Sequence, residues 1–142
     1  MLRNLQDKAV IRIIDANINR VKEALRVCEE VTRFVMDNRP LTSGLKNIRH
    51  EVDLAIKALP VSFSARLEAR CSRQDVGKDV FGRELYRADI GDVFFANMQR
   101  VKECTRVLEE FSKLVSVKAA VKFKRLRYQA YDIEKRAKKF IS

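Results

Sequence analysis

Apolar residues in the first part of the chain recur every three or four positions, which is the spacing of an amphipathic helix. Between residues 10 and 35 they include Ile14, and on a helical wheel they gather on one arc that holds Val21, Ala24, Leu25, Val27, Cys28, Val31 and Val35. The segment DNRP at residues 37–40 interrupts this pattern. A second helical pattern follows from Leu41 to Leu59, and Pro60 ends it. The pattern predicts a helical hairpin over residues 10–59.

A second pair of helices is predicted in the last part of the chain. Asp89 is a candidate N-cap, with Asp92 in the first turn of a helix that runs to about Val115. Another helix is predicted over residues 117–141. The periodicity is weaker over residues 61–88, where we expect a short helix from Ser62 to Arg70 and then a loop.

The two pairs of helices are related by an internal repeat. NINRVKEALRVCEE at residues 17–30 returns as NMQRVKECTRVLEE at residues 97–110. LKNIRHEVDLAIKAL at 45–59 likewise corresponds to FKRLRYQAYDIEKRA at 123–137. We therefore predict a single all-α domain over residues 1–142. Its four-helix core consists of two hairpins, about 10–59 and 89–141, with a central insertion of loop and short helix.

The repeat preserves polar residues better than apolar ones, although core positions accept many apolar side chains. On the wheels, each half places one Asn and two Arg among apolar positions: Asn17, Arg20 and Arg49, then Asn97, Arg100 and Arg127. Glu23 falls at the edge of the first arc, whereas Glu29 is predicted to point away from it. A buried guanidinium keeps its charge and needs an anion.

Two interpretations of these arginines compete. In the structural one, acidic residues at the end of the bundle pair with them, the candidates being Glu23, Glu30, Glu103, Glu110 and Asp132. In the functional one, a cleft between the hairpins opens to solvent, and Asn and Arg donors hold phosphate oxygens, which suit the planar guanidinium. The repetition of four arginines favours the functional interpretation, with Glu23 and Glu103 orienting the arginines.

The central loop adds further candidates in the stretch ARCSRQDVGKD. Arg70 offers another guanidinium, and Asp75 is a carboxylate able to hold Mg²⁺ or accept a proton. Gly77 permits a positive φ or a close approach of backbone to a ligand. No Walker motif GxxxxGK[ST] is present. We expect the 70–88 loop to cover the site.

Charge and composition narrow the class of protein. The net charge of +11 favours anionic partners, namely nucleic acid, a membrane surface or phosphorylated small molecules. No apolar run approaches the roughly 20 residues of a membrane span, and the N-terminus does not resemble a signal peptide, so a cytoplasmic protein is expected.

Cys28, Cys71 and Cys104 are expected to be free thiols. His50 is the single histidine and points away from the apolar arc, which argues against a histidine-based metal site or triad.

Four stretches, RIIDANINRVKEALRVCEE, ARCSRQDVG, FANMQRVKECTRVLEE and FKRLRYQAYDIEK, resemble the small hydroxymethylpyrimidine-phosphate kinase family of thiamine biosynthesis. Members of that family stand alone or are fused ahead of thiamine-phosphate synthase. The resemblance runs from Arg12 to about Lys138. It implies transfer of the γ-phosphoryl group of ATP onto hydroxymethylpyrimidine phosphate to give the diphosphate, and phosphoryl transfer in general is helped by arginines and Mg²⁺. The motif positions that match are Asn17, Arg20, Glu23, Arg26, Arg70, Asp75, Gly77, Asn97, Arg100, Glu103 and Arg106. Many relatives have an acidic residue where Cys71 stands.

The resulting hypothesis is an all-helical phosphoryl-transfer enzyme. Arg20, Arg100 and Asp75 are the expected catalytic residues, with Asp75 also the expected Mg²⁺ ligand. The expected phosphate-binding and substrate-binding residues are Asn17, Asn97, Arg49, Arg127, Arg70, Gly77, Glu23 and Glu103. Its partners would be ATP and a phosphorylated pyrimidine, with thiamine-phosphate synthase or a second copy of the chain as further partners. One alternative is a nucleic-acid-binding helical domain, which inward-pointing arginines disfavour; another is a non-catalytic relative that binds phosphate ligands.

Overall fold

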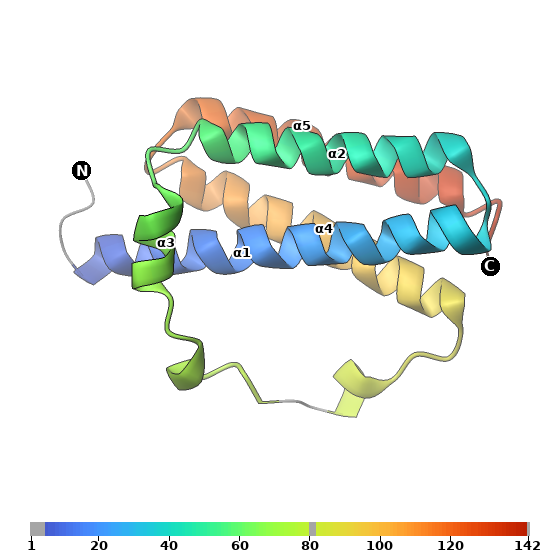
Figure 1. Cartoon of the computed structure of the whole chain (residues 1–142), viewed down its shortest axis with the longest axis horizontal. Helices are drawn as coiled ribbons and strands as arrows, with labels where there is room; N and C mark the ends of the chain where they lie inside the picture. The colour runs from blue at the N-terminus through green and yellow to red at the C-terminus, as the bar shows by residue number, and fades with distance from the viewer. Residues whose placement is uncertain (1–4, 80–81, 142) are drawn as a thin grey trace.

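Four long helices form the body of the protein in the computed structural model, which describes residues 5–79 and 82–141 (Figure 1). They are α1 (Leu5–Glu30), α2 (Arg39–Lys57), α4 (Ile90–Ser112) and α5 (Val117–Ala137). The short helix α3 (Phe63–Ala69) and two 3₁₀ turns, Ser72–Gln74 and Gly82–Leu85, lie between α2 and α4. The described residues include helices and no strand, so the prediction of an all-α fold is confirmed.

The helix starts follow from short polar side chains that cap them. Each cap accepts a hydrogen bond from a backbone N–H three residues later, which satisfies one of the free donors at a helix start. The capping residues are Asn38 for α2, Ser62 for α3, Asp89 for α4 and Ser116 for α5. The prediction that Asp89 caps a helix is thereby confirmed, with its Oδ1 2.8 Å from the N–H nitrogen of Asp92.

The first helix ends differently from the others. After Glu30 the chain continues as a π-helical turn over Val31–Val35, so that the helical pattern reaches residue 35 as predicted. Asp37 then adopts a φ of 47°, in the left-handed region that a short polar side chain tolerates. This turn reverses the chain into α2.

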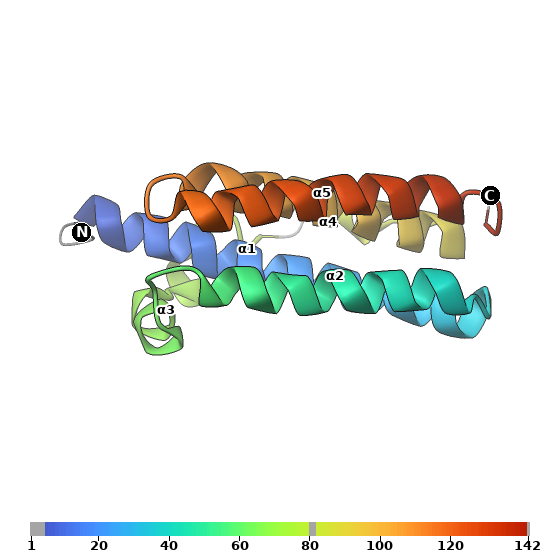
Figure 2. The same cartoon turned by 90° about the horizontal axis from the view of Figure 1, so that it is seen from above.

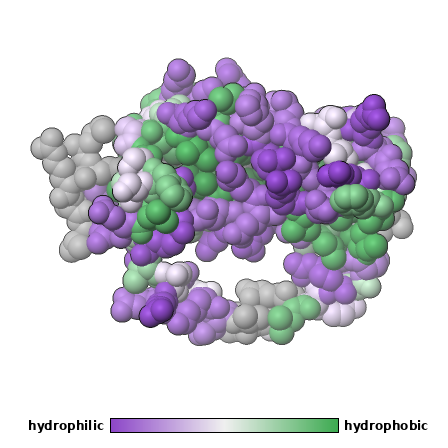
Figure 3. Space-filling view, in the orientation of Figure 1, coloured by the Kyte–Doolittle hydropathy of each residue, from purple (hydrophilic) through white to green (hydrophobic). Residues whose placement is uncertain are grey.

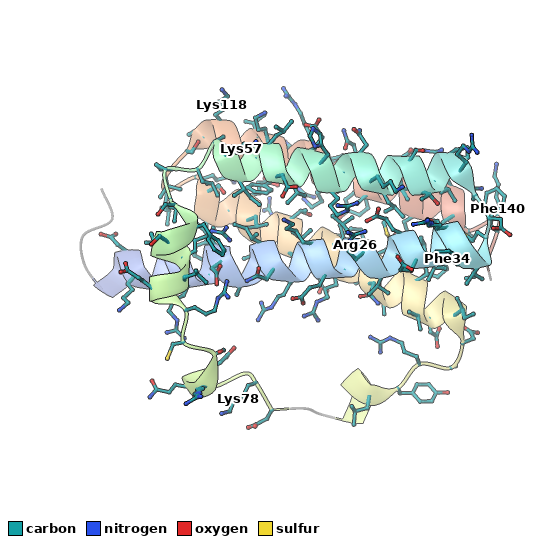
Figure 4. The ribbon with its side chains drawn as sticks, in the orientation of Figure 1. Arg26, Phe34, Lys57, Lys78, Lys118 and Phe140 are labelled. Carbon is teal, nitrogen blue, oxygen red and sulfur yellow. The ribbon has the colours of Figure 1, made fainter. Side chains whose placement is uncertain are left out.

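The helices pack as two hairpins side by side. Figures 1 and 2 show α1 beside α4 and α2 beside α5, with neighbouring helices running in opposite directions. Phe34 and Phe140 accordingly lie at one end of the bundle, and Lys57 and Lys118 at the other (Figure 4). The short helix α3 lies across the first half of α1.

The core is continuous along the bundle. Its fully buried side chains include Ile14, Val21, Leu25, Leu45, Val52, Phe94, Met98, Leu108 and Phe123. Burial of each such side chain contributes roughly 1.5–3 kcal/mol to folding. Val21 and its repeat equivalent Val101 are both fully buried, one on α1 and one on α4. None of the described helices is long and apolar enough to span a membrane.

The connection from α3 to α4 stands apart from the bundle. We call its described residues, 70–79 and 82–89, the strap; Val80 and Phe81, which belong to the predicted covering loop, lie outside the described residues. The strap runs along the side formed by α1 and α4, and the space-filling view shows an open hollow between it and the bundle (Figure 3). Because α2 and α5 lie on the opposite side of the bundle, α1 and α4 are the long helices that face this hollow.

Candidate functional site

A polar cleft of about 670 Å³ opens where the first part of the strap meets α1. Side chains project from α1 toward the strap in Figure 4, and Lys78 lies on the strap itself. The polar side chains of its lining come from three elements: Arg12, Asp15, Asn17, Asn19, Arg20 and Glu23 from α1; Arg70, Cys71, Ser72 and Asp75 from the strap; and Arg100 from α4. Residues from both hairpins and from the central insertion therefore meet at one site.

Six of the predicted site residues line this cleft. They are Asn17, Arg20, Glu23, Arg70, Asp75 and Arg100. The other five, Asn97, Arg49, Arg127, Gly77 and Glu103, are absent from its lining. The candidate site is thus built mainly from the first hairpin and the strap, with one arginine from the second hairpin.

Arg20 and Arg100 bring the two halves of the repeat together. Both side chains are exposed, where the wheel placed them inside the apolar arc. The reason is that their neighbours Val21 and Val101 occupy the buried positions, and the next residue along a helix is rotated by about 100°. Among the described residues, neither guanidinium has an ion pair or hydrogen-bond partner in the protein. Two unpaired positive charges therefore face solvent at the cleft.

The pKa of the buried thiol of Cys104 is affected by the same charged residues. Burial raises the pKa of Cys104, and the charges of Arg100 and Arg20 act against that rise. Glu103 and Glu23 add to it. Both arginines and both glutamates of the repeat are thus within electrostatic reach of one point between α1 and α4.

The two asparagines make the same local contact. The Asn17 Nδ2 atom donates to the Ile13 carbonyl oxygen at 2.8 Å, and the Asn97 Nδ2 atom donates to that of Val93 at 2.8 Å. Asn17 is buried at the floor of the cleft, and Asn97 is half-buried outside its lining. Each amide keeps a second N–H and its oxygen for other partners.

Arg49 and Arg127 are held by buried acids inside the bundle. The Arg49 Nε and Nη2 atoms donate to the two carboxylate oxygens of Glu29 at 2.8 and 3.2 Å. The Arg127 Nη2 atom donates to Glu109 Oε1 at 2.9 Å. These hydrogen bonds raise the pKa of both guanidinium groups. The structural interpretation therefore describes these two arginines, which lie outside the cleft lining.

The acids that pair with Arg49 and Arg127 differ from the expected ones. Glu29 was predicted to point away from the core, yet only 2% of its surface is exposed. The wheel located a single apolar arc on α1, but α1 packs against both α4 and α2 and therefore buries a wider arc. Glu29 lies in the part of that arc that faces α2, which carries Arg49. Its repeat equivalent Glu109 takes the same place beside Arg127.

The remaining predicted residues have local roles. Glu103 accepts a hydrogen bond from Gln99 Nε2 at 3.1 Å on the surface of α4. Gly77 does not adopt the positive φ that its lack of a side chain permits. Its N–H donates to Asp75 Oδ1 at 2.8 Å in a turn of the strap. Arg106 forms ion pairs with Glu109 and Glu110.

Sequence reasoning missed Asp15. This carboxylate is 2% exposed and accepts hydrogen bonds from Arg70 Nε at 2.8 Å, Arg70 Nη2 at 2.9 Å and Arg66 Nη1 at 3.3 Å. The hydrogen bonds with Asp15 raise the pKa of Arg70. The signal that identified Asn17, a polar residue among apolar positions of the first helix, applies equally to Asp15 between Ile14 and Ile18.

Two exposed carboxylates line the cleft. They suit a magnesium ion that is bound partly by substrate and water better than a metal ion that is held by protein ligands alone. The described residues contain no group of three or more His, Cys, Asp or Glu side chains able to hold a metal. Mg²⁺ commonly binds through one or two carboxylates together with substrate phosphates and water. Asp75 and Glu23 both line the cleft and offer that donor set.

Comparisons with known proteins agree on one family. The model of the ThiD2 family matches residues 12–136. The chain is 40% identical over 131 residues to a thiamine-phosphate synthase of Nostoc punctiforme, covering 89% of this chain and 35% of that protein. Proteins of the same name from Synechocystis sp. and Rhodopirellula baltica are 37% identical over 133 residues and 36% identical over 131 residues. These two alignments cover 89% and 92% of this chain, and 35% and 34% of the relatives. The chain thus spans about a third of the curated relatives that it matches. No solved structure matches it.

Proposed function

The chain belongs to the ThiD2 family, and on this basis we propose that it is an enzyme of thiamine biosynthesis that transfers a phosphoryl group from ATP to hydroxymethylpyrimidine phosphate. The relatives named thiamine-phosphate synthase support the pathway. The sequence resemblance and the chemistry of the cleft support the kinase reaction.

One observation carries the proposal: two unpaired arginines, Arg20 and Arg100, reach the same cleft from the two halves of the molecule. Catalysis of phosphoryl transfer consists mainly of positioning the two reactants and stabilising the charge on the phosphoryl oxygens. Guanidinium groups supply both functions because their planar N–H donors match phosphate oxygens. A bound Mg²⁺, held by Asp75 and Glu23, would add further charge neutralisation.

The proposed reaction needs no general base. An oxygen of the acceptor's phosphate attacks the γ-phosphorus of ATP, a new P–O bond forms, and the bond to the β-phosphate oxygen breaks, with its electron pair leaving on ADP. The second pKa of a phosphate monoester is about 6, so the attacking oxygen is already deprotonated at neutral pH. A reaction without a general base agrees with a cleft that is lined by arginines and carboxylates. His50, the single histidine, is exposed on α2.

The same arginines would select a phosphorylated acceptor over the free alcohol. A site built to hydrogen-bond a charged group rejects an analogue without that group because its polar side chains are left unpaired. We therefore expect turnover with hydroxymethylpyrimidine phosphate and little with hydroxymethylpyrimidine.

The proposal is tested by incubating the protein with ATP, Mg²⁺ and hydroxymethylpyrimidine phosphate and separating the products by chromatography. The diphosphate should form, and Arg20→Met and Arg100→Met should each lower kcat by roughly 10²–10³-fold, as expected when a donor to the transition state is lost. Arg125→Met removes an exposed arginine on α5 as the matched control. Full turnover in both cleft variants would refute these roles. Binding of ATP without any diphosphate would instead favour the non-catalytic relative.

A further inference from the structure

Asp15 forms ion pairs with Arg66 and Arg70, and we call these three residues the clamp. The clamp joins three elements at one edge of the cleft. Asp15 lies on α1, Arg66 near the end of α3, and Arg70 at the start of the strap. The Asp15 side chain is 3% exposed and those of Arg66 and Arg70 are 10% and 38% exposed. Both carboxylate oxygens receive guanidinium donors, so Asp15 has little capacity left to bind a metal ion or accept a substrate proton.

The clamp carries more positive than negative charge. One carboxylate faces two guanidinium groups, and the Nε atom of Arg66 is buried with no hydrogen-bond partner. Arg70 uses its Nε and Nη2 atoms for Asp15, and its half-exposed side chain lines the cleft. The edge of the Arg70 guanidinium that includes Nη1 makes no hydrogen bond within the described residues, which leaves it available to an anion.

This clamp breaks the symmetry of the repeat. The position equivalent to Asp15 on α4 is Phe95, which cannot bind an arginine in this way. Arg20 and Arg100 are equivalent by sequence, but Arg12 and Arg70 join the cleft on the side of α1 alone. Most arginines of the lining therefore lie on α1 and the strap, and α4 contributes only Arg100.

We propose that Asp15 is a positioning residue that fixes Arg70 for binding the polyphosphate chain of a nucleoside triphosphate at the α1 side of the cleft. This inference rests on the proposed function and extends it by assigning a side to each substrate. The triphosphate carries more negative charge than the monophosphate acceptor, and it occupies the side with more arginines. The acceptor then lies toward α4, with Arg20 and Arg100 between the two.

The test compares Asp15→Asn and Arg70→Met with the parent protein. In Asp15→Asn an NH₂ group replaces one oxygen and faces a guanidinium, so Arg70 loses its fixed position. We expect each variant to raise the Kd for ATP and for inorganic tripolyphosphate by about ten- to a hundredfold, the range for a hydrogen bond to a charged group. The KM for the acceptor should stay within about twofold. The double variant should bind ATP little worse than Arg70→Met alone.

Glu29→Gln is the matched control, because it alters another buried carboxylate that binds an arginine but lies away from the cleft. It should lower thermal stability without changing the Kd for ATP. A similar loss of ATP affinity in Glu29→Gln, or an unchanged Kd in Asp15→Asn, would overturn the proposal. If Asp15→Asn fails to fold, an unchanged Kd for ATP in Arg70→Met overturns it, and a raised one supports it.

The binding measurements also separate this inference from the proposed kinase reaction. If the parent protein forms no diphosphate but Arg70→Met weakens tripolyphosphate binding, the role of the clamp is supported and the proposed function is refuted. If the parent forms the diphosphate but the Kd for ATP is unchanged in both variants, the proposed function is supported and the role of the clamp is refuted.

Discussion

The polar residues shared by the two repeats divide according to the acceptors within their reach. Arg49 finds Glu29, and Arg127 finds Glu109, so these guanidinium groups stabilise the bundle. Arg20 has no carboxylate within ion-pair distance among the described residues, and the same is true of Arg100. Among the four arginines of the repeat, a buried acid therefore distinguishes the two structural ones from the two that are free for a ligand.

Arg49→Met should lower stability without affecting ligand binding. The substitution leaves Glu29, 3% exposed, without its bidentate partner. Breaking a buried pair costs roughly 3–5 kcal/mol, and we expect about 3 kcal/mol because the Arg49 side chain is itself 27% exposed. Urea denaturation measures this loss, while the Kd for ATP should match that of the parent. A loss of nucleotide affinity with unchanged stability would return Arg49 to the phosphate-binding residues.

Cys28 should make the folded state sensitive to alkaline pH. Burial, with smaller contributions from Glu134 and Glu29, raises the pKa of this thiol from 9.0 to about 12. The unfolded state therefore loses the thiol proton at lower pH than the folded state, and stability falls as pH rises from about 9 to 12. A difference of three pKa units corresponds to about 4 kcal/mol over that range.

The variant Cys28→Ala isolates this effect from the titration of lysine and tyrosine. It should be less stable than the parent at pH 8, because a buried side chain is shortened, and the gap should narrow or reverse by pH 11. Denaturant midpoints at both pH values measure the gap. A gap that stays constant between pH 8 and pH 11 would show that the Cys28 thiol does not titrate in this way.

At the scale of the helices, Gly44 permits the close approach of α2 and α5. A Cβ atom at this position would lie 3.0 Å from Ile133 Cδ1. Gly44→Val should therefore overpack this contact and cost about 1–3 kcal/mol. Ser43→Val is the control, because Ser43 is exposed on the same helix and has a helix propensity close to that of valine. Equal stability of the two variants, measured by thermal unfolding, would show that α2 and α5 can separate at no cost.

The helices could be predicted from the sequence because local interactions determine where they begin. The contacts of Glu29 and Asp15 could not be predicted because they depend on tertiary packing. Asp89 signals a helix start because its side chain bonds a backbone group three residues away. Glu29 was misplaced because a wheel for one helix does not show that two neighbouring helices cover it. The partners of Asp15 are 51 and 55 positions away, and no spacing rule links residues that a fold brings together over such distances.

At the scale of the whole molecule, both copies of the repeat contribute to the same cleft. The repeat supplies Arg20 and Arg100 in equivalent positions, and α1 and α4 bring them to one cleft. The strap occurs once in the chain and contributes Arg70 and Asp75 to that cleft alone. Under the proposed function, this asymmetry would allow a molecule with a repeated core to distinguish two substrates of different charge.

The net charge of +11 raises the question of nucleic acid as a partner. Such a charge gives some affinity for any polyanion, and non-specific binding to duplex DNA is typically 10⁻⁴–10⁻⁶ M at physiological salt. The arginines of the cleft lie in a hollow of about 670 Å³ lined by α1, α4 and the first part of the strap, a volume in the range of small-molecule sites. We therefore expect duplex binding to stay in the non-specific range at 150 mM salt and to weaken steeply as salt is added.

The double variant Arg20→Met, Arg100→Met distinguishes the two kinds of binding. It should lose ATP affinity while its affinity for a 20-base-pair duplex changes little, because the other lysines and arginines of the surface remain. Fluorescence anisotropy at several salt concentrations measures both ligands on the same protein. Nanomolar duplex binding that ATP displaces and that the double variant abolishes would identify the cleft as a nucleic-acid site. Binding that is weak and indifferent to both arginines would place the excess charge on the outer surface, where it attracts polyanions without selecting among them.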